Sequence, residues 1–260
     1  MTRWLAHMPE GTGPVVVCFP FAGGGASAFA AWRRALQPDL CVCAVQPPGR
    51  EGRSAEARFR DYPAFRDALS EALLPVLVGR RAVFYGHSLG AWVAWDVARA
   101  LSAAGTAPLG LIVGAQRAPS CPYPFRHEST MEDSELAGFL SRFDGLPAGL
   151  TGSFIQWMLP LVRDDLRLCE THPTTNVKES FPIRALSGRS DRLVSEDDVR
   201  AWSCHTTSEF RHSAIDGGHF FIRSHQACVL DHIRRSVWEW AAADTHLGAA
   251  ALPIRPRSTS

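Results

Sequence analysis

Short apolar runs alternate with longer amphipathic runs along most of the chain. The run at 14–20 (PVVVCFP) is apolar throughout and rich in β-branched residues, which is typical of a strand buried on both faces of a parallel sheet. Runs of this kind predict strands at 14–20, 40–49, 81–86 and 109–115, and less clean runs predict two more strands at 182–188 and 209–216. Helical spacing predicts helices at 26–36, 62–77, 91–105 and 220–242. The alternation predicts an α/β fold with a mostly parallel central sheet and helices on both faces.

The rhythm changes between about 121 and 180, where no buried strand is predicted. Asp133 is placed to cap a helix over 134–143, and a second helix is predicted over 153–170. Pro160 should kink or split that second helix, because it removes a backbone hydrogen bond. A helical insertion between two strands is typical of a lid, although an ordinary pair of packing helices gives the same pattern.

The composition fits one globular domain over 1–260, with the insertion at about 121–180 and a flexible tail at 247–260. There are 27 basic and 26 acidic residues, so the net charge is +1. This argues against nucleic acid as the main partner, since phosphate binding needs a cationic excess. No stretch approaches the ~20 apolar residues of a membrane helix, and no signal-peptide pattern opens the chain.

The cysteines favour a reducing compartment. Their number is odd, and their spacing matches neither a zinc site nor a disulfide framework. The seven are Cys18, Cys41, Cys43, Cys121, Cys169, Cys204 and Cys228. We therefore expect free thiols in a cytoplasmic protein that binds no metal.

Residues 86–90 (GHSLG) have the G-x-S-x-G spacing of a nucleophile elbow. The bare pattern is weak, but here it follows a predicted strand and opens a predicted helix. A sharp turn at this point leaves no room for side chains at 86 and 90, and it exposes Ser88 at the carboxyl end of the strand. We predict that Ser88 is a nucleophile; the alternative is a serine that caps the helix.

A serine nucleophile needs a base that is held by an acid, in the chain order Ser, acid, His. Among the histidines after Ser88, His219 follows two glycines in a loop (DGGHFF), which favours it as the base. Asp191 lies in a turn after the strand at 182–188, which favours it as the acid. Three other carboxylates are less suitable. Asp197 and Asp198 look like ordinary charges in the first turn of a helix, and Asp216 is too close to His219 in sequence.

The oxyanion of such a reaction needs two donors. The backbone N–H of Leu89 follows the nucleophile and supplies one. The glycine-rich loop at 19–25 (FPFAGGG) should supply the other, from Ala22 or its neighbour. A merely flexible turn is the alternative, while a phosphate loop is disfavoured because no Lys-Ser/Thr follows.

These residues lie within a wider set of motifs that resembles the type II thioesterases of polyketide and nonribosomal peptide synthesis, which are α/β-hydrolases. The resemblance covers about 14–240. Its motifs are CFPFAGG (18–24), QPPGREGR (46–53), GHSLGA (86–91), GAQRAP (114–119), LPLVRDDLRLCET (159–171), SGRSDRLVS (187–195) and GGHFF (217–221). By motif, the resemblance implies the same roles for Ser88, Asp191, His219, Ala22 and Leu89. It departs at Phe21, often His in the family, and at Asp164, often Ala.

The resemblance also implies a role. Such enzymes use no cofactor and no metal, and they remove wrong or stalled acyl groups from the phosphopantetheine arm of acyl or peptidyl carrier proteins. We expect a monomer whose insertion forms the acyl channel and whose arginines steer the carrier. The channel prediction comprises Phe21, Phe154, Trp157, Met158 and Leu161, and the docking prediction comprises Arg50 and Arg53.

Two rival functions remain open at this stage. A carboxylesterase acting on small oxygen esters would use the same triad, because the triad does not distinguish a thioester from an ester. An inactive hydrolase fold could instead serve only to bind carrier proteins, although the complete set of Ser88, Asp191 and His219 disfavours this.

Overall fold

The molecule is built on one six-stranded sheet in which all neighbouring strands are parallel, in the order β2-β1-β3-β4-β5-β6. The structure is a computed structural model that describes residues 2–125, 127–143, 145 and 152–250. The strands are β1 (Val15–Phe19), β2 (Cys41–Ala44), β3 (Ala82–His87), β4 (Gly110–Gly114), β5 (Ile183–Gly188) and β6 (Phe210–Ile215). The predicted parallel sheet is confirmed; only the strand at 40–49 was predicted too long.

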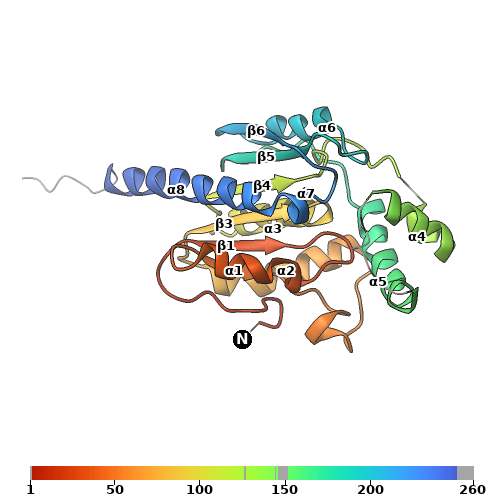
Figure 1. Cartoon of the computed structure of the whole chain (residues 1–260). Helices are drawn as coiled ribbons and strands as arrows, with labels where there is room; N and C mark the ends of the chain where they lie inside the picture. Colours follow the sequence, from red (N-terminus) through yellow and green to blue (C-terminus); the bar gives the residue numbers. More distant parts are fainter. Residues whose placement is uncertain (1, 126, 144, 146–151, 251–260) are drawn as a thin grey trace, which may run out of the picture.

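Helices cover both faces of this sheet (Figure 1). The α-helices are α1 (Ala30–Leu36), α2 (Tyr62–Leu77), α3 (Leu89–Ala103), α4 (Asp133–Arg142), α5 (Gly152–Glu170), α6 (Glu196–Arg200), α7 (Phe221–Ser224) and α8 (Gln226–Ala250). The short 3-10 helices are η1 (Ala26–Phe29), η2 (Glu51–Arg53), η3 (Glu128–Thr130) and η4 (Ala201–His205).

The helices differ from prediction in four places. α5 runs unbroken through Pro160, so the predicted split is wrong. Asp133 is the first helical residue of α4 rather than its cap. The helix predicted at 220–242 is divided at His225 into α7 and α8. The tail predicted from 247 begins as the last turn of α8, and its remainder at 251–260 lies outside the described residues.

Alternation along the strands supplies a core on each face. In β1, Val15, Val17 and Phe19 belong to the core under α2 and α3, while Val16 and Cys18 belong to the core under α1 and α8. All five are fully buried. Each buried side chain of this size stabilises the fold by about 1.5–3 kcal/mol relative to exposure, so the strands that carry the motif-bearing loops are firmly anchored in the core.

α4 and α5 stand apart from the sheet, beyond the carboxyl ends of the strands (Figure 1). They share a small core of their own, formed by Leu136, Phe139, Leu159, Val162 and Leu166. Between 121 and 180 the described residues contain helices, loops and one isolated bridge at Glu179, but no strand. We call this segment the lid. It lies at the edge of the sheet where an α/β fold binds its ligands.

Three further observations come from the fold. All seven cysteines are free thiols. Across the ranges that the structure describes, no helix is long and apolar enough to cross a membrane. In the same ranges, no group of three or more His, Cys, Asp or Glu side chains is placed to hold a metal ion.

Candidate active site

Ser88 sits at a strained turn between β3 and α3. Its φ is 53° and its ψ is −128°, a conformation that costs a non-glycine residue on the order of 1–3 kcal/mol. The flanking glycines make the turn possible. A Cβ on Gly86 would lie 2.5 Å from the Cα of Ala91, and a Cβ on Gly90 would lie 2.6 Å from the carbonyl oxygen of Pro20. The packing therefore requires glycine at both positions, as the elbow pattern predicted.

The three residues of the predicted triad meet at this turn, from three separate loops. Ser88 Oγ lies 3.0 Å from His219 Nε2, and His219 Nδ1 lies 2.9 Å from Asp191 Oδ2. Although Ser88 occupies the N-cap position of α3, its side chain makes no capping hydrogen bond. The hydroxyl therefore points to a base and not to the helix, as a nucleophile requires.

Asp191 is held as an anion by its own loop. Its Oδ1 accepts hydrogen bonds from the backbone N–H groups of Leu193 at 2.8 Å and Val194 at 3.2 Å. Burial opposes ionisation of this carboxyl, but the hydrogen bond and charge of His219, together with the two amides, outweigh burial and lower its pKa. Oδ2 is left to accept the Nδ1–H of His219, which directs the imidazole Nε2 toward Ser88.

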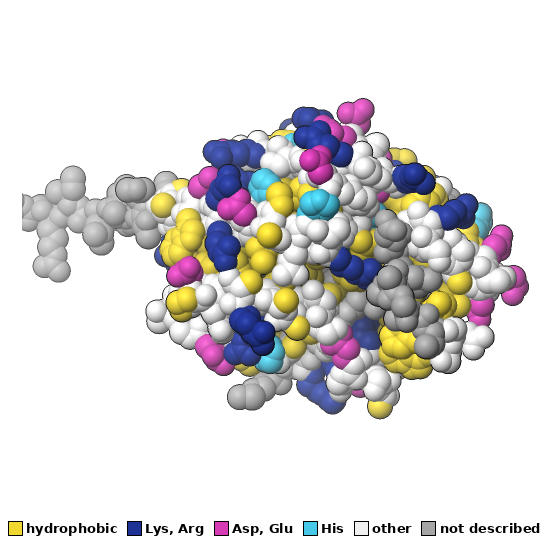
Figure 2. Space-filling view, viewed as in Figure 1, with side chains coloured by type: hydrophobic (Ala, Val, Ile, Leu, Met, Phe, Trp, Pro, Cys, Tyr) yellow, Lys and Arg dark blue, Asp and Glu magenta, His cyan; other side chains and the backbone are white. Residues whose placement is uncertain are grey.

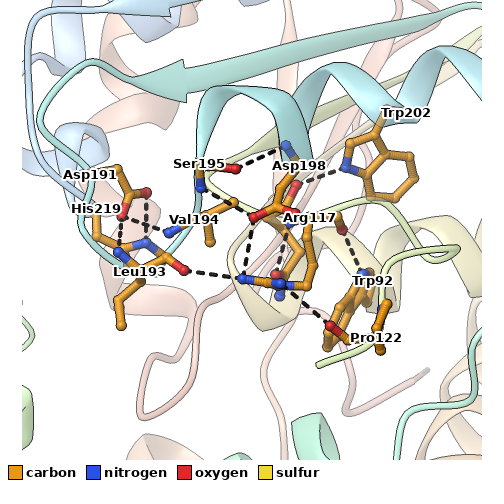
Figure 3. A network of polar contacts seen from close by, with 11 residues as sticks. Trp92, Arg117, Pro122, Asp191, Leu193, Val194, Ser195, Asp198, Trp202 and His219 are labelled. Atoms are coloured by element: carbon orange, nitrogen blue, oxygen red, sulfur yellow. Dashed lines mark hydrogen bonds and ion pairs between the residues drawn. The ribbon is translucent and has the colours of Figure 1, made fainter. Parts of the chain in front are cut away.

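Arg117 ties the Asp191 loop to the rest of the molecule (Figure 3). Its Nη2 donates to the carbonyl of Leu193 at 3.2 Å, and its Nη1 donates to the carbonyl of Pro122 at 3.3 Å. The carbonyl of Arg117 accepts from Trp92 Nε1 at 2.8 Å, which joins this network to α3. The buried guanidinium of Arg117 thus joins the Asp191 loop to the first residues of the lid, and the backbone carbonyl of the same residue joins both to α3.

His87, the residue before Ser88, anchors the backbone of His219. Its Nε2 lies 2.8 Å from the carbonyl oxygen of His219, and its Nδ1 lies 3.2 Å from the hydroxyl of Tyr85. Because the carbonyl only accepts, Nε2 carries the proton and Nδ1 accepts from Tyr85. Complete burial is the main cause that lowers the pKa of His87 to about 3, so this imidazole is neutral.

This burial predicts an acid sensitivity. An unfolded histidine takes up a proton near pH 6.5, whereas His87 in the native state stays neutral down to about pH 3. Between these values the unfolded state binds the extra proton, so stability falls as pH falls. We expect the free energy of unfolding to drop by about 2 kcal/mol less in His87→Gln than in the wild type between pH 7 and pH 5.

Urea unfolding at the two pH values measures this difference. Tyr85→Phe is the control, because it removes a hydrogen bond from the same imidazole and leaves the titrating group in place. An identical loss of stability in His87→Gln and the wild type would mean that other groups cause the acid sensitivity.

The predicted oxyanion loop lies against the elbow. Gly90 packs onto the backbone of Phe19 and Pro20, two residues before Ala22 in the chain. Within the described part of the chain, neither the Ala22 amide nor the Leu89 amide donates a hydrogen bond to another protein group. Ala22 lines the same cavity as Ser88, and Leu89 follows Ser88 in the chain, so these two N–H groups are candidates to bind an oxygen that gains negative charge.

A cavity of about 700 Å³ opens over Ser88 and His219. The lid forms much of its wall, and all five residues of the channel prediction line it: Phe21, Phe154, Trp157, Met158 and Leu161. The glycine-rich loop and the loop after His219 line it as well. A lining dominated by apolar and aromatic groups suits an acyl chain more than a charged substrate.

The docking prediction is wrong for both arginines. The side chain of Arg50 is 7% exposed and forms a buried ion pair with Asp165. The side chain of Arg53 is 11% exposed, pairs with Glu56 and lies 4.6 Å from the centre of the Trp4 ring. Sequence position alone suggested an exposed loop, but both guanidinium groups have partners within the fold and are not free to meet a carrier protein.

Three residues that support this site were not predicted from the sequence: Asp165, Arg117 and His87. Arg117 and His87 lie within the motifs GAQRAP and GHSLGA, and Arg50, the partner of Asp165, lies within QPPGREGR. A motif does not say which carboxylate an arginine will pair with. Asp165 lies 115 residues from Arg50 in the chain, so only the closed fold could pair them.

Comparison with known proteins gives one consistent result. The family model of the thioesterase domain matches residues 14–237. A probable cadicidin biosynthesis thioesterase of Streptomyces griseus is 33% identical over 90% of this chain and 66% of its own length. Thioesterase PikA5 of Streptomyces venezuelae is 33% identical over 84% of this chain and 80% of its own. The solved structure of the type II thioesterase BorB from the borrelidin cluster has a TM-score of 0.80 at 33% identity, over 90% and 97% of the two chains.

Proposed function

Because the chain belongs to the thioesterase family and is similar to its type II members, we propose that it hydrolyses acyl thioesters on the phosphopantetheine arm of carrier proteins in polyketide or nonribosomal peptide synthesis. Its role there is to remove aberrant or stalled acyl groups. Ser88 is the nucleophile, His219 the base and Asp191 the acid that orients the base. The amides of Ala22 and Leu89 bind the oxyanion.

The first half-reaction forms an acyl-enzyme. His219 Nε2 takes the proton of the Ser88 hydroxyl as the oxygen attacks the thioester carbonyl, and the resulting oxyanion accepts hydrogen bonds from Ala22 and Leu89. The imidazolium that forms is stabilised by Asp191. The C–S bond then breaks, and His219 returns the proton to the departing thiolate of the arm.

The second half-reaction releases the acid. Water takes the place of the thiol, His219 Nε2 removes its proton, and the same two amides bind the second oxyanion. The C–O bond to Ser88 breaks and the serine recovers its proton from His219. No step uses a metal or an organic cofactor.

The observation that carries this proposal is the 3.0 Å contact between Ser88 Oγ and His219 Nε2 at the floor of an apolar cavity. The test compares kcat/KM for one acyl group on a carrier protein, on pantetheine and as a p-nitrophenyl ester. We expect the carrier substrate to be best. A better rate on the oxygen ester would favour the carboxylesterase function instead.

The acyl channel should be permissive. Met158 is flexible and half-buried and lines the cavity with Leu161. One methylene in an apolar pocket changes binding by only about 1–3 kcal/mol, so discrimination by chain length should be modest. We expect Met158→Ala to shift the preferred acyl chain toward longer chains by one to two carbons, measured as kcat/KM across a panel of acyl-pantetheines.

The alternative for Met158 is simple packing within the lid. That role predicts a lower melting temperature with an unchanged chain-length profile. Measuring both quantities on the same variant separates the two roles.

With both arginines engaged, we propose that the lid receives the carrier protein. Hydrophobic side chains gather over the beginning of α5 (Figure 2), where Trp157 is 59% exposed at the wall of the cavity. Exposed aromatic rings of this kind often dominate binding energy at interfaces. We expect Trp157→Ser to lower kcat/KM about 10-fold on an acyl-carrier substrate and clearly less on acyl-pantetheine.

Trp238→Ser is the matched control, because Trp238 is 51% exposed on α8 and does not line the cavity. Trp238→Ser should leave kcat/KM unchanged on both substrates. An equal loss on both substrates in Trp157→Ser would mean that the ring contacts the acyl chain and not the carrier.

We further propose that the enzyme acts as a monomer in the cytoplasm. All residues assigned to the reaction come from one chain, and its cysteines are free thiols. Light scattering of the purified protein tests the monomeric state, since a dimer would give twice the molar mass of the single chain.

A further inference from the structure

One carboxylate of the lid forms a hydrogen bond with the oxyanion loop, residues 21–25. Oδ2 of Asp165, on α5, accepts the backbone N–H of Gly23 at 2.7 Å. Arg50 pairs with both oxygens of the same carboxylate, at 2.6 Å and 2.8 Å, and its Nη1 also donates to the carbonyl of Gly24 at 2.9 Å. Loop, lid and the segment after β2 thus meet at one buried ion pair.

These contacts fix the peptide groups that follow Ala22. Gly23 has a φ of +78°, and the N–H of Gly24 donates to the carbonyl of Phe21 at 2.8 Å, so the loop turns sharply. A Cβ on Gly23 would lie 2.7 Å from Cγ2 of Val162, which is also on α5. The direction of the Ala22 amide therefore depends on a loop that α5 holds by a hydrogen bond and by close packing.

The buried negative charge of Asp165 needs the positive charge of Arg50 beside it. The side chain of Asp165 is only 6% exposed, so an unpaired carboxylate here would oppose the negative charge that develops on the oxyanion nearby. The guanidinium of Arg50 neutralises it and leaves it as a hydrogen-bond acceptor for Gly23. A fork-shaped, permanently charged group suits this two-point contact better than an ammonium.

We propose that Asp165 and Arg50 are positioning residues that hold the oxyanion loop in its productive conformation, so that the oxyanion hole is complete only when α5 is seated. Neither residue touches the reacting atoms. The inference rests on the proposed role of Ala22 in binding the oxyanion.

The chain offers a matched control in the adjacent residue. Asp164 is also buried on α5 and also pairs with the segment after β2, through Arg58 at 2.6 Å and Arg60 at 2.9 Å, but it makes no hydrogen bond to the oxyanion loop. Asp164→Asn therefore removes a buried ion pair of the lid in the same way as Asp165→Asn, but at a carboxylate that does not contact the oxyanion loop.

The experiment measures kcat, KM and the affinity for an alkyl boronic acid, which forms a tetrahedral adduct with the serine. We expect Asp165→Asn to lower kcat on acyl-pantetheine roughly 10- to 100-fold with KM within about threefold of wild type, and to weaken boronate binding in parallel. Asp164→Asn should keep both quantities near wild type. Equal losses in the two variants, or an unchanged kcat in Asp165→Asn, would overturn the proposal.

Arg50→Lys provides a second test if Asp165→Asn does not fold. It keeps the charge and loses the two-point contact, so we expect a smaller fall in kcat, about 3- to 10-fold, again with little change in KM. A raised KM at unchanged kcat would contradict the proposal. Labelling of wild-type Ser88 by a fluorophosphonate checks the premise separately, since its failure would count against the proposed function and not against the positioning role of Asp165 and Arg50.

Discussion

Replacing Ser88 by Ala will reduce thioester hydrolysis by at least about 1,000-fold, because it removes the hydroxyl that contacts His219 Nε2 and forms the acyl-enzyme. His219→Ala will cause a loss of the same order, since the hydroxyl that lies 3.0 Å from its Nε2 then has no base. Single-turnover kinetics on acyl-pantetheine measures both losses, and a fluorophosphonate should label the wild type at Ser88 only.

The double variant is the sharper test of a shared mechanism. If the two residues act as one unit, Ser88→Ala combined with His219→Ala will lose little more than either single variant. Losses that multiply would show that the two residues act independently. Ser187→Ala is a suitable control, because Ser187 also contacts a histidine, His212 at 2.9 Å, but does not line the cavity.

Asp191→Asn will lower kcat by about 10³- to 10⁴-fold, although it changes the shape of the site very little. The reason lies in the loop. Oδ1 of residue 191 accepts two backbone N–H groups, so an asparagine must place its oxygen there and its NH₂ group toward His219. His219 Nδ1 must then accept, which puts the proton on Nε2 and leaves no lone pair for the Ser88 proton.

The orientation of the imidazole separates this outcome from unfolding. The variant should keep the wild-type melting temperature to within a few degrees, and NMR of the His219 ring should show the proton moved to Nε2. Asp197→Asn is the control, since Asp197 lies in the exposed first turn of α6. Wild-type activity in Asp191→Asn would assign the acid to another carboxylate.

The positions of reacting groups along the chain were predictable because they depend on local rules. Glycines at 86 and 90 are required by one turn, and the two glycines before His219 mark the loop that follows β6. The strands β1, β3 and β4 were predictable for the same reason, since burial on both faces imposes a continuous apolar run on each. The edge strand β6 is only partly buried and gave a less clear pattern. The glycine positions and the apolar runs can each be recognised within a short stretch of sequence.

The partners of charged side chains were not predictable in this way. The sequence around Arg50 and Arg53 is consistent with an exposed basic loop, and the prediction placed them at a carrier interface. Only the closed fold brings Asp165 to Arg50 across 115 residues. Pro160 is a second case in which local sequence was misleading. Local propensity predicted a break in the helix, but packing of one face of α5 maintains the helix through Pro160.

The sequence by itself therefore determined the sheet, the elbow and the three residues proposed to react, since each follows from sterics and periodicity over a few neighbours. The tertiary structure alone decided what holds them in register: Arg117 on the Asp191 loop, His87 on the backbone of His219, and Asp165 on the oxyanion loop. The physical reason is that a buried polar group must find a partner within about 3 Å. Which group that is depends on how distant segments pack, and no local pattern contains that information.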